Sequence, residues 1–228
     1  MREPPQIAES WNAEYRRGRY ADDPPVPFVS EILVTLRRHP EVWARSGLYV
    51  GCGNGRNFLP LVDGGARLHG LDISEEAIAR LRQRRPDHPF PLAVGDFRTE
   101  AGDTAFGYVV AIQVFQHGTE RDAAQYFDRT VEILPAGGLF CLRVNAASTE
   151  INNRHTVLER NRFGGFTVRY DEGPKCGLPV HFYSREELIA LTEHNFEPVL
   201  GPREDITRRV PPKNGSWAQW EVIWRRIG

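Results

Sequence analysis

Short runs of apolar residues alternate with segments of helical periodicity through the middle of the chain. Several of the runs carry apolar residues consecutively, which is typical of parallel strands covered on both faces. Five strands are therefore expected, at residues 48–50, 67–71, 90–94, 108–114 and 139–144. Helices are expected between them, near residues 57–62, 74–84 and 120–134, the second with Ser74 as its N-cap. This alternation predicts an α/β fold with an open, mostly parallel sheet and right-handed crossovers.

The segments on either side of this core have a different pattern. The first 45 residues predict a helical segment, in which a proline-rich break separates a helix near residues 7–17 from later apolar positions at helical spacing. A polar insertion follows the fifth strand over residues 145–177. The remaining elements are expected to be a helix at 184–194 with Ser184 as N-cap, and strands at 196–200 and 217–223 joined through a loop at 211–215.

Charge is balanced over the chain, which narrows the classes of partner. Lys and Arg total 29, Asp and Glu total 30, the net charge is −1, and only two of the basic residues are lysines. A protein that coats nucleic acid or an anionic membrane needs a basic surplus, so neither partner is expected. The N-terminal residues are polar, and no apolar run approaches the length of a membrane span, which predicts a soluble, cytoplasmic protein.

Thiol and imidazole groups are too scattered to predict a disulfide framework or a metal site. The three cysteines, Cys52, Cys141 and Cys176, form no C-x-x-C pair, and the histidines show no tight ligand spacing. We therefore expect reduced thiols and no metal.

The most informative motif is a glycine loop between the first strand and the following helix. It reads Gly51-Cys52-Gly53-Asn54-Gly55-Arg56-Asn57. Glycines permit positive φ and close backbone approach, so a helix N-terminus can meet a ligand directly. A dinucleotide fingerprint needs a small residue at the position of Arg56, and a Walker loop needs a lysine that is absent here. The loop therefore fits neither ligand well.

Two carboxylates follow neighbouring strands at positions that suit a nucleoside. Asp72 ends the second strand, where a carboxylate can accept hydrogen bonds from a ribose diol. Asp96 follows the third strand, where it could meet an adenine amino group. The alternative for either residue alone is that it caps a nearby turn or helix. Together with the glycine loop, the two carboxylates predict a nucleoside site with no evident need for a pyrophosphate.

On these residues the chain resembles the class I S-adenosylmethionine-dependent methyltransferases, over about residues 47–144. The glycine run is especially similar to the tellurite-resistance and thiopurine methyltransferase-like branch, which acts on small molecules. The resemblance implies a Rossmann-like, doubly wound sheet of seven strands with an antiparallel C-terminal strand, and an N-terminal helical lid. It also implies methyl transfer from S-adenosylmethionine to a small-molecule acceptor.

The resemblance assigns a cofactor site as well. The glycines would lie against the methionine moiety and Asp72 would bind the ribose. Asp96 with Phe97 would bracket the adenine, and Gln113 would touch the methionine end. The residues expected to bind the cofactor are Gly51, Cys52, Gly53, Asn54, Gly55, Asn57, Asp72, Ile73, Asp96, Phe97 and Gln113. One departure is Tyr49, which stands where the family usually carries an acidic residue.

Chemistry is expected after the fourth strand, at the carboxyl end of the sheet. Because a sulfonium methyl is already activated, the protein must mainly align the acceptor, exclude water and, where necessary, remove a proton. His117 is the candidate general base, since its intrinsic pKa suits neutral pH. The alternatives are that His117 packs, or that it caps the helix beginning near Thr119.

Contacts with the acceptor are predicted around the same edge. Trp11 and Tyr20 would wall the acceptor as part of the lid, unless this segment only packs on the core. His155 and His181 are further candidates, with a solvated loop and plain packing as their respective alternatives. An anionic acceptor is suggested by nearby arginines, unless they belong to a solvated loop: Arg143, Arg154, Arg162 and Arg169. Three C-terminal tryptophans are expected to pack the last strand: Trp217, Trp220 and Trp224.

The chain is expected to form one domain of four parts. These are an N-terminal helical segment (1–45), a cofactor-binding core (46–146), an insertion that caps the acceptor (147–183) and a C-terminal helix and strand pair (184–228).

Other functions stay open at this point. A nucleic-acid methyltransferase would be expected to show a basic surface, and often an Asn-Pro-Pro-Tyr-type motif where this chain reads Gln113-Val114-Phe115-Gln116. A non-catalytic nucleoside-binding module is another alternative. An oxidoreductase is the last, and the glycine spacing counts against it.

Overall fold

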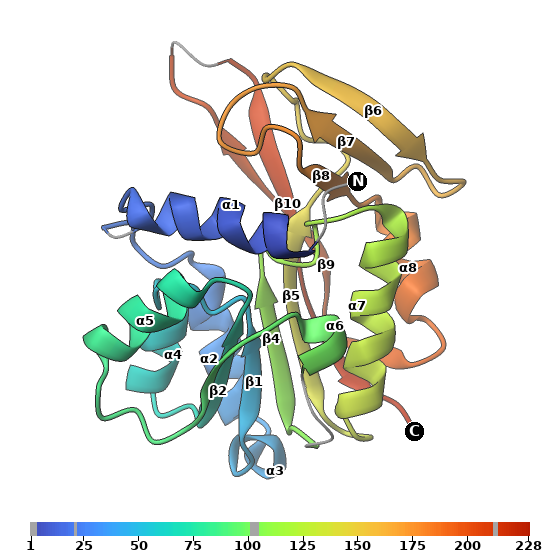
Figure 1. The fold of residues 1–228 in the computed structure, drawn as a ribbon. Helices are drawn as coiled ribbons and strands as arrows, with labels where there is room; N and C mark the ends of the chain where they lie inside the picture. The colour runs from blue at the N-terminus through green and yellow to red at the C-terminus, as the bar shows by residue number, and fades with distance from the viewer. Residues whose placement is uncertain (1–3, 21, 101–104, 212–213) are drawn as a thin grey trace.

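A seven-stranded sheet forms the centre of the molecule (Figure 1). The structure is a computed structural model that describes residues 4–20, 22–100, 105–211 and 214–228. The strand order is β3-β2-β1-β4-β5-β10-β9. Strands β1 to β5 are parallel, and β10 pairs antiparallel with both β5 and β9. The mostly parallel seven-stranded sheet with an antiparallel C-terminal strand is therefore confirmed.

Most strands lie close to their expected positions. The strands of the central sheet are β1 (Gly47–Val50), β2 (Leu68–Asp72), β3 (Leu92–Val94), β4 (Tyr108–Ile112), β5 (Leu139–Asn145), β9 (Phe196–Arg208) and β10 (Ser216–Arg226). The last two are longer than expected, and β9 continues well past residue 200. The loop expected at 211–215 includes residues 212–213, which lie outside the described residues.

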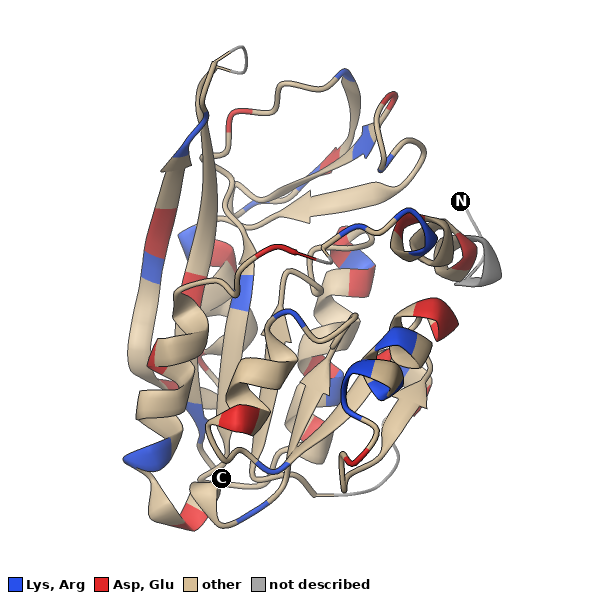
Figure 2. Cartoon of the chain, turned by 90° about the vertical axis from the view of Figure 1, so that its left-hand side faces the viewer, with Lys and Arg blue, Asp and Glu red and all other residues tan. Residues whose placement is uncertain are grey.

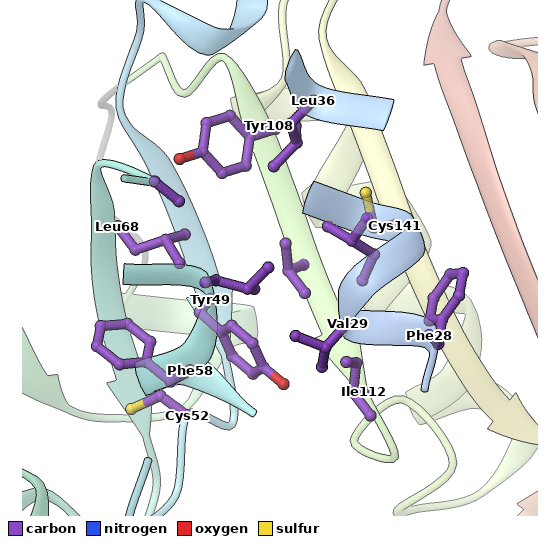
Figure 3. Close-up of a cluster of buried hydrophobic side chains, with 14 of the residues drawn as sticks. Phe28, Val29, Leu36, Tyr49, Cys52, Phe58, Leu68, Tyr108, Ile112 and Cys141 are labelled. Carbon is purple, nitrogen blue, oxygen red and sulfur yellow. The ribbon is translucent and has the colours of Figure 1, made fainter. Parts of the chain in front are cut away.

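Helices cover both faces of the sheet, which explains the consecutive apolar runs in its strands. Every residue of β1, β4 and β5 is buried. One face packs against α2 (Phe28–Arg37), α4 (Phe58–Asp63) and α5 (Glu75–Arg84), and Figure 3 shows buried side chains of this layer. The other face packs against α6 (Phe97–Glu100), α7 (Glu120–Ile133) and α8 (Arg185–Thr192). Two further helices are α1 (Pro4–Arg16) and the short α3 (Pro40–Trp43).

Side-chain caps start helices where the sequence predicts them. The Ser74 and Ser184 hydroxyls each accept a hydrogen bond from the backbone N–H three residues on, at the start of α5 and α8. Each contact satisfies an N–H group that the helix itself leaves unpaired. At α7, Thr119 and Asp122 form a reciprocal capping box. The cap of α7 is therefore Thr119, which removes the alternative role considered for His117.

A second, antiparallel sheet lies beyond the carboxyl ends of the core strands (Figure 1). We call this unit the cap sheet; it consists of β6 (His155–Arg160), β7 (Phe166–Tyr170) and β8 (Pro179–Phe182). The segment is expected from the sequence to be a polar insertion at residues 145–177, with no strands predicted in it. The strands escape a hydrophobicity pattern because β6 buries none of its residues, and the small core of the unit is made by Val168, Val180 and Phe182.

Across the described ranges, none of the helices combines the length and apolar composition that crossing a membrane requires.

Candidate functional site

A cavity of about 810 Å³ opens at the carboxyl ends of the parallel strands. Its walls come from the loops after β1, β2, β3 and β4, and from β9 and β10. Helix α1 lies across this edge of the sheet, between the core and the cap sheet, and both α1 and the cap sheet complete the wall (Figure 1). Open α/β sheets bind ligands at this edge, and small-molecule sites typically measure about 300–1,000 Å³.

The cavity brings together most of the residues expected to contact cofactor and acceptor. Those that line it are Trp11, Tyr20, Gly51, Cys52, Gly53, Asn54, Asn57, Asp72, Ile73, Asp96, Phe97, Gln113 and His117. Their placement in one wall is an observation, whereas the ligand that each contacts stays a prediction.

The glycine loop forms a cradle that side chains would fill. Gly51 and Gly53 have φ of +67° and +56°, a region that L-residues rarely adopt. A Cβ on Gly51 would lie 2.2 Å from Val114 Cγ2, and one on Gly53 would lie 2.6 Å from the Tyr15 hydroxyl. Gly55 is different, because it does not line the cavity and its Cβ would meet side chains of α4 and α5. Gly55 therefore packs against these helices, and its expected cofactor contact stays a prediction.

Asp72 lies beside this cradle, and backbone hydrogen bonds take up about half of the acceptor capacity of its carboxylate. Its Oδ2 accepts a hydrogen bond from the Gly53 N–H (2.8 Å) and its Oδ1 accepts one from the Ser74 N–H (2.9 Å). A carboxylate has about four lone-pair sites, so acceptors remain for ligand hydroxyls. Burial raises the pKa of Asp72 to about 6, although the two backbone hydrogen bonds oppose the shift. The group is therefore largely ionised at neutral pH.

Asp96 is engaged by an arginine that the sequence reasoning did not single out. Arg98 donates from Nε to Asp96 Oδ1 (3.0 Å), and it also pairs with Asp122. Burial would raise the pKa of Asp96, but the hydrogen bonds from Arg98 outweigh it and the pKa is lowered. Phe97 stacks on Phe115, with ring centroids 5.7 Å apart. Asp96, Phe97, Arg98 and Asp122 all line the cavity, and Phe115 supports Phe97 from behind.

His117, in the loop after β4, contacts Trp11 of α1. Their ring centroids are 4.9 Å apart in an edge-on arrangement, which brings α1 against the loop that carries His117. Burial lowers the pKa of His117 well below its usual range, and the positive charge of Lys175 adds to the effect. The imidazole is therefore neutral at neutral pH. Its Nδ1 is buried and has no hydrogen-bond partner among the described residues.

Gln113 occupies a strained backbone conformation at the end of β4. Its φ is +61°, which is uncommon for a residue with a side chain. Its backbone N–H donates to the Arg143 carbonyl (2.7 Å), and its Nε2 donates to Gln219 Oε1 (3.1 Å). Strain of this kind persists where surrounding contacts over-determine the geometry, and it clusters at ligand sites.

Tyr49 stands where the resembled family usually carries an acidic residue, and its side chain is uncharged. It is 1% exposed and packs edge-on against Phe58, as Figure 3 shows. Burial raises the pKa of its phenol, so the side chain is neutral. The neighbouring Asn57 accepts a hydrogen bond from the Val26 N–H (3.0 Å) and so ties the N-terminal segment to the glycine loop.

Two residues expected to contact the acceptor lie away from the cavity. His181 is 1% exposed, and its ring nitrogens are bonded to Thr167 (2.8 Å) and Glu187 (2.9 Å). Both polar atoms are used inside the protein, so the packing alternative holds. His155 lies on β6, where its Nδ1 contacts the Asn153 carbonyl (2.9 Å), and it does not line the cavity. The cavity therefore lends neither residue support as an acceptor contact, and both assignments stay predictions.

The arginines expected to attract an anion do not serve this purpose either. Arg154, Arg162 and Arg169 are outside the cavity wall. Arg143 is in the wall, but it pairs with Glu221 (2.9 Å) and Asp205 (2.5 Å).

Several residues of the wall were not predicted as site residues, among them Arg98, Tyr15 and Gln219. Trp217, expected only to pack, lines the cavity and donates to Asn145 Oδ1 (3.2 Å). Lys175 also lines the cavity; from the sequence it is one of the charged residues of the polar insertion at 145–177 that could face either a ligand or water. No group of three or more His, Cys, Asp or Glu within the described residues is placed to hold a metal ion.

Comparison with known proteins points to one kind of domain. A family model described as a methyltransferase domain matches residues 48–142. The cypemycin N-terminal methyltransferase of a Streptomyces species is 30% identical over 78 residues. That match spans 34% of this chain and 32% of the relative, so about a third of the relative's length is covered.

Solved structures resemble the whole chain in fold. The 1,6-didemethyltoxoflavin-N1-methyltransferase of Burkholderia thailandensis, solved with 1,6-didemethyltoxoflavin and S-adenosylhomocysteine, gives a TM-score of 0.67 at 19% identity. The alignment covers 100% of this chain and 92% of that one. TehB of Haemophilus influenzae gives 0.63 at 14% identity, covering 93% of this chain and 66% of that one.

Proposed function

We propose that this protein transfers a methyl group from S-adenosylmethionine to a small-molecule acceptor, because residues 48–142 match a family model described as a methyltransferase domain and the central sheet has the class I strand order. The observation that carries the proposal is the cradle of Gly51 and Gly53 beside the part-used carboxylate of Asp72. A positive-φ glycine loop with an adjacent acceptor of hydroxyl hydrogen bonds suits a nucleoside. The bound cofactor would supply an activated methyl group on a sulfonium.

The residues of the cavity wall would have separate roles in binding the cofactor and the acceptor. Asp72 would hold the ribose hydroxyls, and Asp96 with Phe97 would receive the adenine. Trp11 and the rest of α1 would exclude water from the acceptor. His117, neutral because it is buried, would accept a proton if the acceptor must lose one.

Direct binding measurements test the proposal. Isothermal titration with S-adenosylmethionine, S-adenosylhomocysteine and NAD should give a saturable signal for the first two and none for NAD. Absence of binding to either sulfur compound would remove the proposal, and binding of NAD alone would favour an oxidoreductase.

A small acceptor is proposed rather than nucleic acid. Basic and acidic residues are interspersed along the helices and strands (Figure 2), and the net charge is −1. Nucleic-acid binding draws on a basic surface. The similar structures include proteins named for toxoflavin and glycopeptide methylation, which is compatible with a small acceptor. We further propose that residues 147–183 cap the acceptor. Mass spectrometry of candidate acceptors for the gain of one methyl group tests the choice of a small acceptor over nucleic acid. Methylation of RNA or DNA instead would contradict it.

We also propose a cytoplasmic location. The three cysteines are free thiols, as expected in a reducing compartment. Cell fractionation checks this point.

A further inference from the structure

The positive charges in the cavity wall are neutralised within the protein, with one exception. Four lining arginines each pair with a carboxylate: Arg19 with Glu14, Arg56 with Asp23, Arg98 with Asp96, and Arg143 with Glu221. The fifth lining cation is Lys175. In the part of the chain that the structure describes, its ammonium group has neither an ion pair nor a hydrogen bond with another side chain.

Lys175 enters the cavity from the cap sheet. It lies in the turn between β7 and β8, where its carbonyl accepts a hydrogen bond from the Leu178 N–H (3.0 Å). The charged or titratable groups that act on it from neighbouring elements are Arg19, which follows α1, and His117, which follows β4. One is a cation and the other a neutral imidazole. No element that meets Lys175 in this wall therefore supplies it with a negative charge.

Lys175 is partly buried in the cavity wall and lacks an anionic partner there among the described residues. Taking an ammonium group out of water costs free energy unless a negative charge compensates it. Burial, together with the charge of Arg19, accordingly lowers the pKa of Lys175 to about 8. An anion inside the cavity would restore the missing interaction, and a carboxylate forms charge-assisted hydrogen bonds with an ammonium group.

We propose that Lys175 binds a carboxylate inside the cavity and that this carboxylate belongs to the acceptor, which is therefore an organic acid. This inference rests on the proposed function. The methionine end of the cofactor also carries a carboxylate, so the experiment must distinguish the two sources.

The chain offers a direct observation of Lys175, because its sequence holds only two lysines, Lys175 and Lys213. Protein labelled with ¹³C at lysine Cε gives two side-chain resonances, which Lys175→Arg assigns. The pKa of Lys175 is then followed in the free protein, with S-adenosylhomocysteine, and with S-adenosylhomocysteine plus matched acids and amides. Suitable pairs are benzoate with benzamide, nicotinate with nicotinamide, and propionate with propionamide.

The expected result is that at least one acid raises the pKa of Lys175 towards its ordinary value while its amide does not. The inference is overturned if no acid does so, or if S-adenosylhomocysteine alone produces the whole rise and acids add nothing. The second result would assign the lysine to the cofactor. Failure of the proposed function is seen separately, as absence of any response to S-adenosylhomocysteine in either the spectrum or a titration.

Variants give a second readout. Lys175→Met keeps the length of the side chain and should lose roughly 10- to 100-fold in affinity for the acid probe, with binding of S-adenosylhomocysteine unchanged. Lys175→Arg should retain most of the preference for acid over amide. Arg154→Gln is the control, because Arg154 is an exposed cation beside the cap sheet that pairs with Glu172 and does not line the cavity. Equal affinity of Lys175→Met and the wild type for the acid would contradict the inference.

Discussion

Two opposing effects set the pKa of Asp72, and the resulting charge of its carboxylate affects ligand binding. Burial disfavours its ionised form, while hydrogen bonds from the Gly53 and Ser74 N–H groups favour it. The same hydrogen bonds fix the carboxylate against the glycine loop. The hydrogen bonds that position the Asp72 carboxylate beside the glycine loop are thus the same ones that favour its ionised form.

Replacing this carboxylate tests its role in the cofactor site. Asp72→Asn should weaken binding of S-adenosylhomocysteine by roughly 10- to 100-fold, since hydrogen bonds to a charged group contribute about 1.5–3 kcal/mol. Calorimetry measures the affinity, and thermal unfolding shows whether the variant is folded. Asp63→Asn is the matched control, because Asp63 is 57% exposed and pairs with Arg85 outside the cavity. A similar loss in both variants would argue against a direct contact.

The raised pKa of Asp72 predicts a pH dependence of binding. Above pH 6 the carboxylate is ionised and accepts hydrogen bonds from hydroxyls, so affinity for S-adenosylhomocysteine should fall as the pH drops through about 6. The free energy of unfolding should show the opposite pH dependence. The folded pKa lies above the ordinary value of 3.8, so the contribution of this group to stability is fully present below about pH 4 and is lost as the pH rises through 6. Asp72→Asn should remove both dependences, as titrations and unfolding curves across pH 4.5–8 would show.

His117 permits a separate test of proton transfer. His117→Ala should lower turnover of an acceptor that must lose a proton by about 100-fold or more, while binding of S-adenosylhomocysteine stays within about twofold. His155→Ala is the control, since His155 lies outside the cavity. Unchanged turnover of the true acceptor by His117→Ala would leave only the packing alternative.

At this scale, sequence reasoning succeeds where backbone chemistry dictates the residue. Gly51, Gly53 and Asp72 follow strand ends, and only certain residue types satisfy the geometry there. It does not reach the surroundings of His181, because the atoms that occupy its ring belong to β7 and α8. Such partners come together only in the folded chain.

Asn12 contributes to joining helix α1 to the start of α5. Asn12 Oδ1 accepts a hydrogen bond from the Ser74 hydroxyl (2.7 Å) and another from the Glu76 N–H (3.2 Å), both at the start of α5. On its other side, α1 presents Trp11 to His117. The helix therefore connects the start of α5 with the loop after β4.

Loosening this attachment distinguishes a lid from plain packing. Asn12→Ala should lower catalytic efficiency toward the acceptor by about tenfold, while the free energy of unfolding falls by only about 1–2 kcal/mol. Steady-state kinetics and urea unfolding give the two quantities. Arg17→Gln, at an exposed position of the turn after α1, should change neither. Reduced stability with unaltered kinetics would mean that α1 only packs, and removal of residues 1–20 would repeat the comparison more severely.

Among the elements, the parallel strands and their helices could be predicted and the cap sheet could not. β1, β4 and β5 are covered on both faces and therefore carry unbroken apolar runs. β6 and the part of β9 beyond residue 200 expose much of their surface, so their sequences alternate too weakly to indicate strands. Their backbone pairing is supplied by neighbours, β7 for one and β10 for the other.

For the molecule as a whole, a buried polar cluster joins the cap sheet to the core. Glu187 on α8 contacts His181 on β8 (2.9 Å) and accepts a hydrogen bond from Asn161 Nδ2 (2.7 Å) in the turn between β6 and β7. Glu187 is 3% exposed. The position of the cap sheet over the cavity therefore depends on a contact remote from any ligand.

Removing one member of this cluster should affect the whole fold. Glu187→Ala leaves buried polar groups without their partner, and we expect a loss of about 3 kcal/mol in the free energy of unfolding. Chemical denaturation measures it. Glu186→Ala, one position away and exposed, should cost less than about 0.5 kcal/mol. Near-equal stability of the two variants would show that the cluster contributes little to joining the two sheets.

The place of β10 in the sheet has a consequence for the order of events during protein synthesis. β10 fills the gap between β5 and β9, yet residues 216–226 are translated after both of these strands. On a ribosome, β5 therefore emerges with one edge unpaired, and it stays so while the cap sheet, α8 and β9 are made. An unpaired edge of buried residues is prone to aggregation. A stalled chain that lacks β10 should accordingly be a substrate for chaperones, whereas the released protein should not.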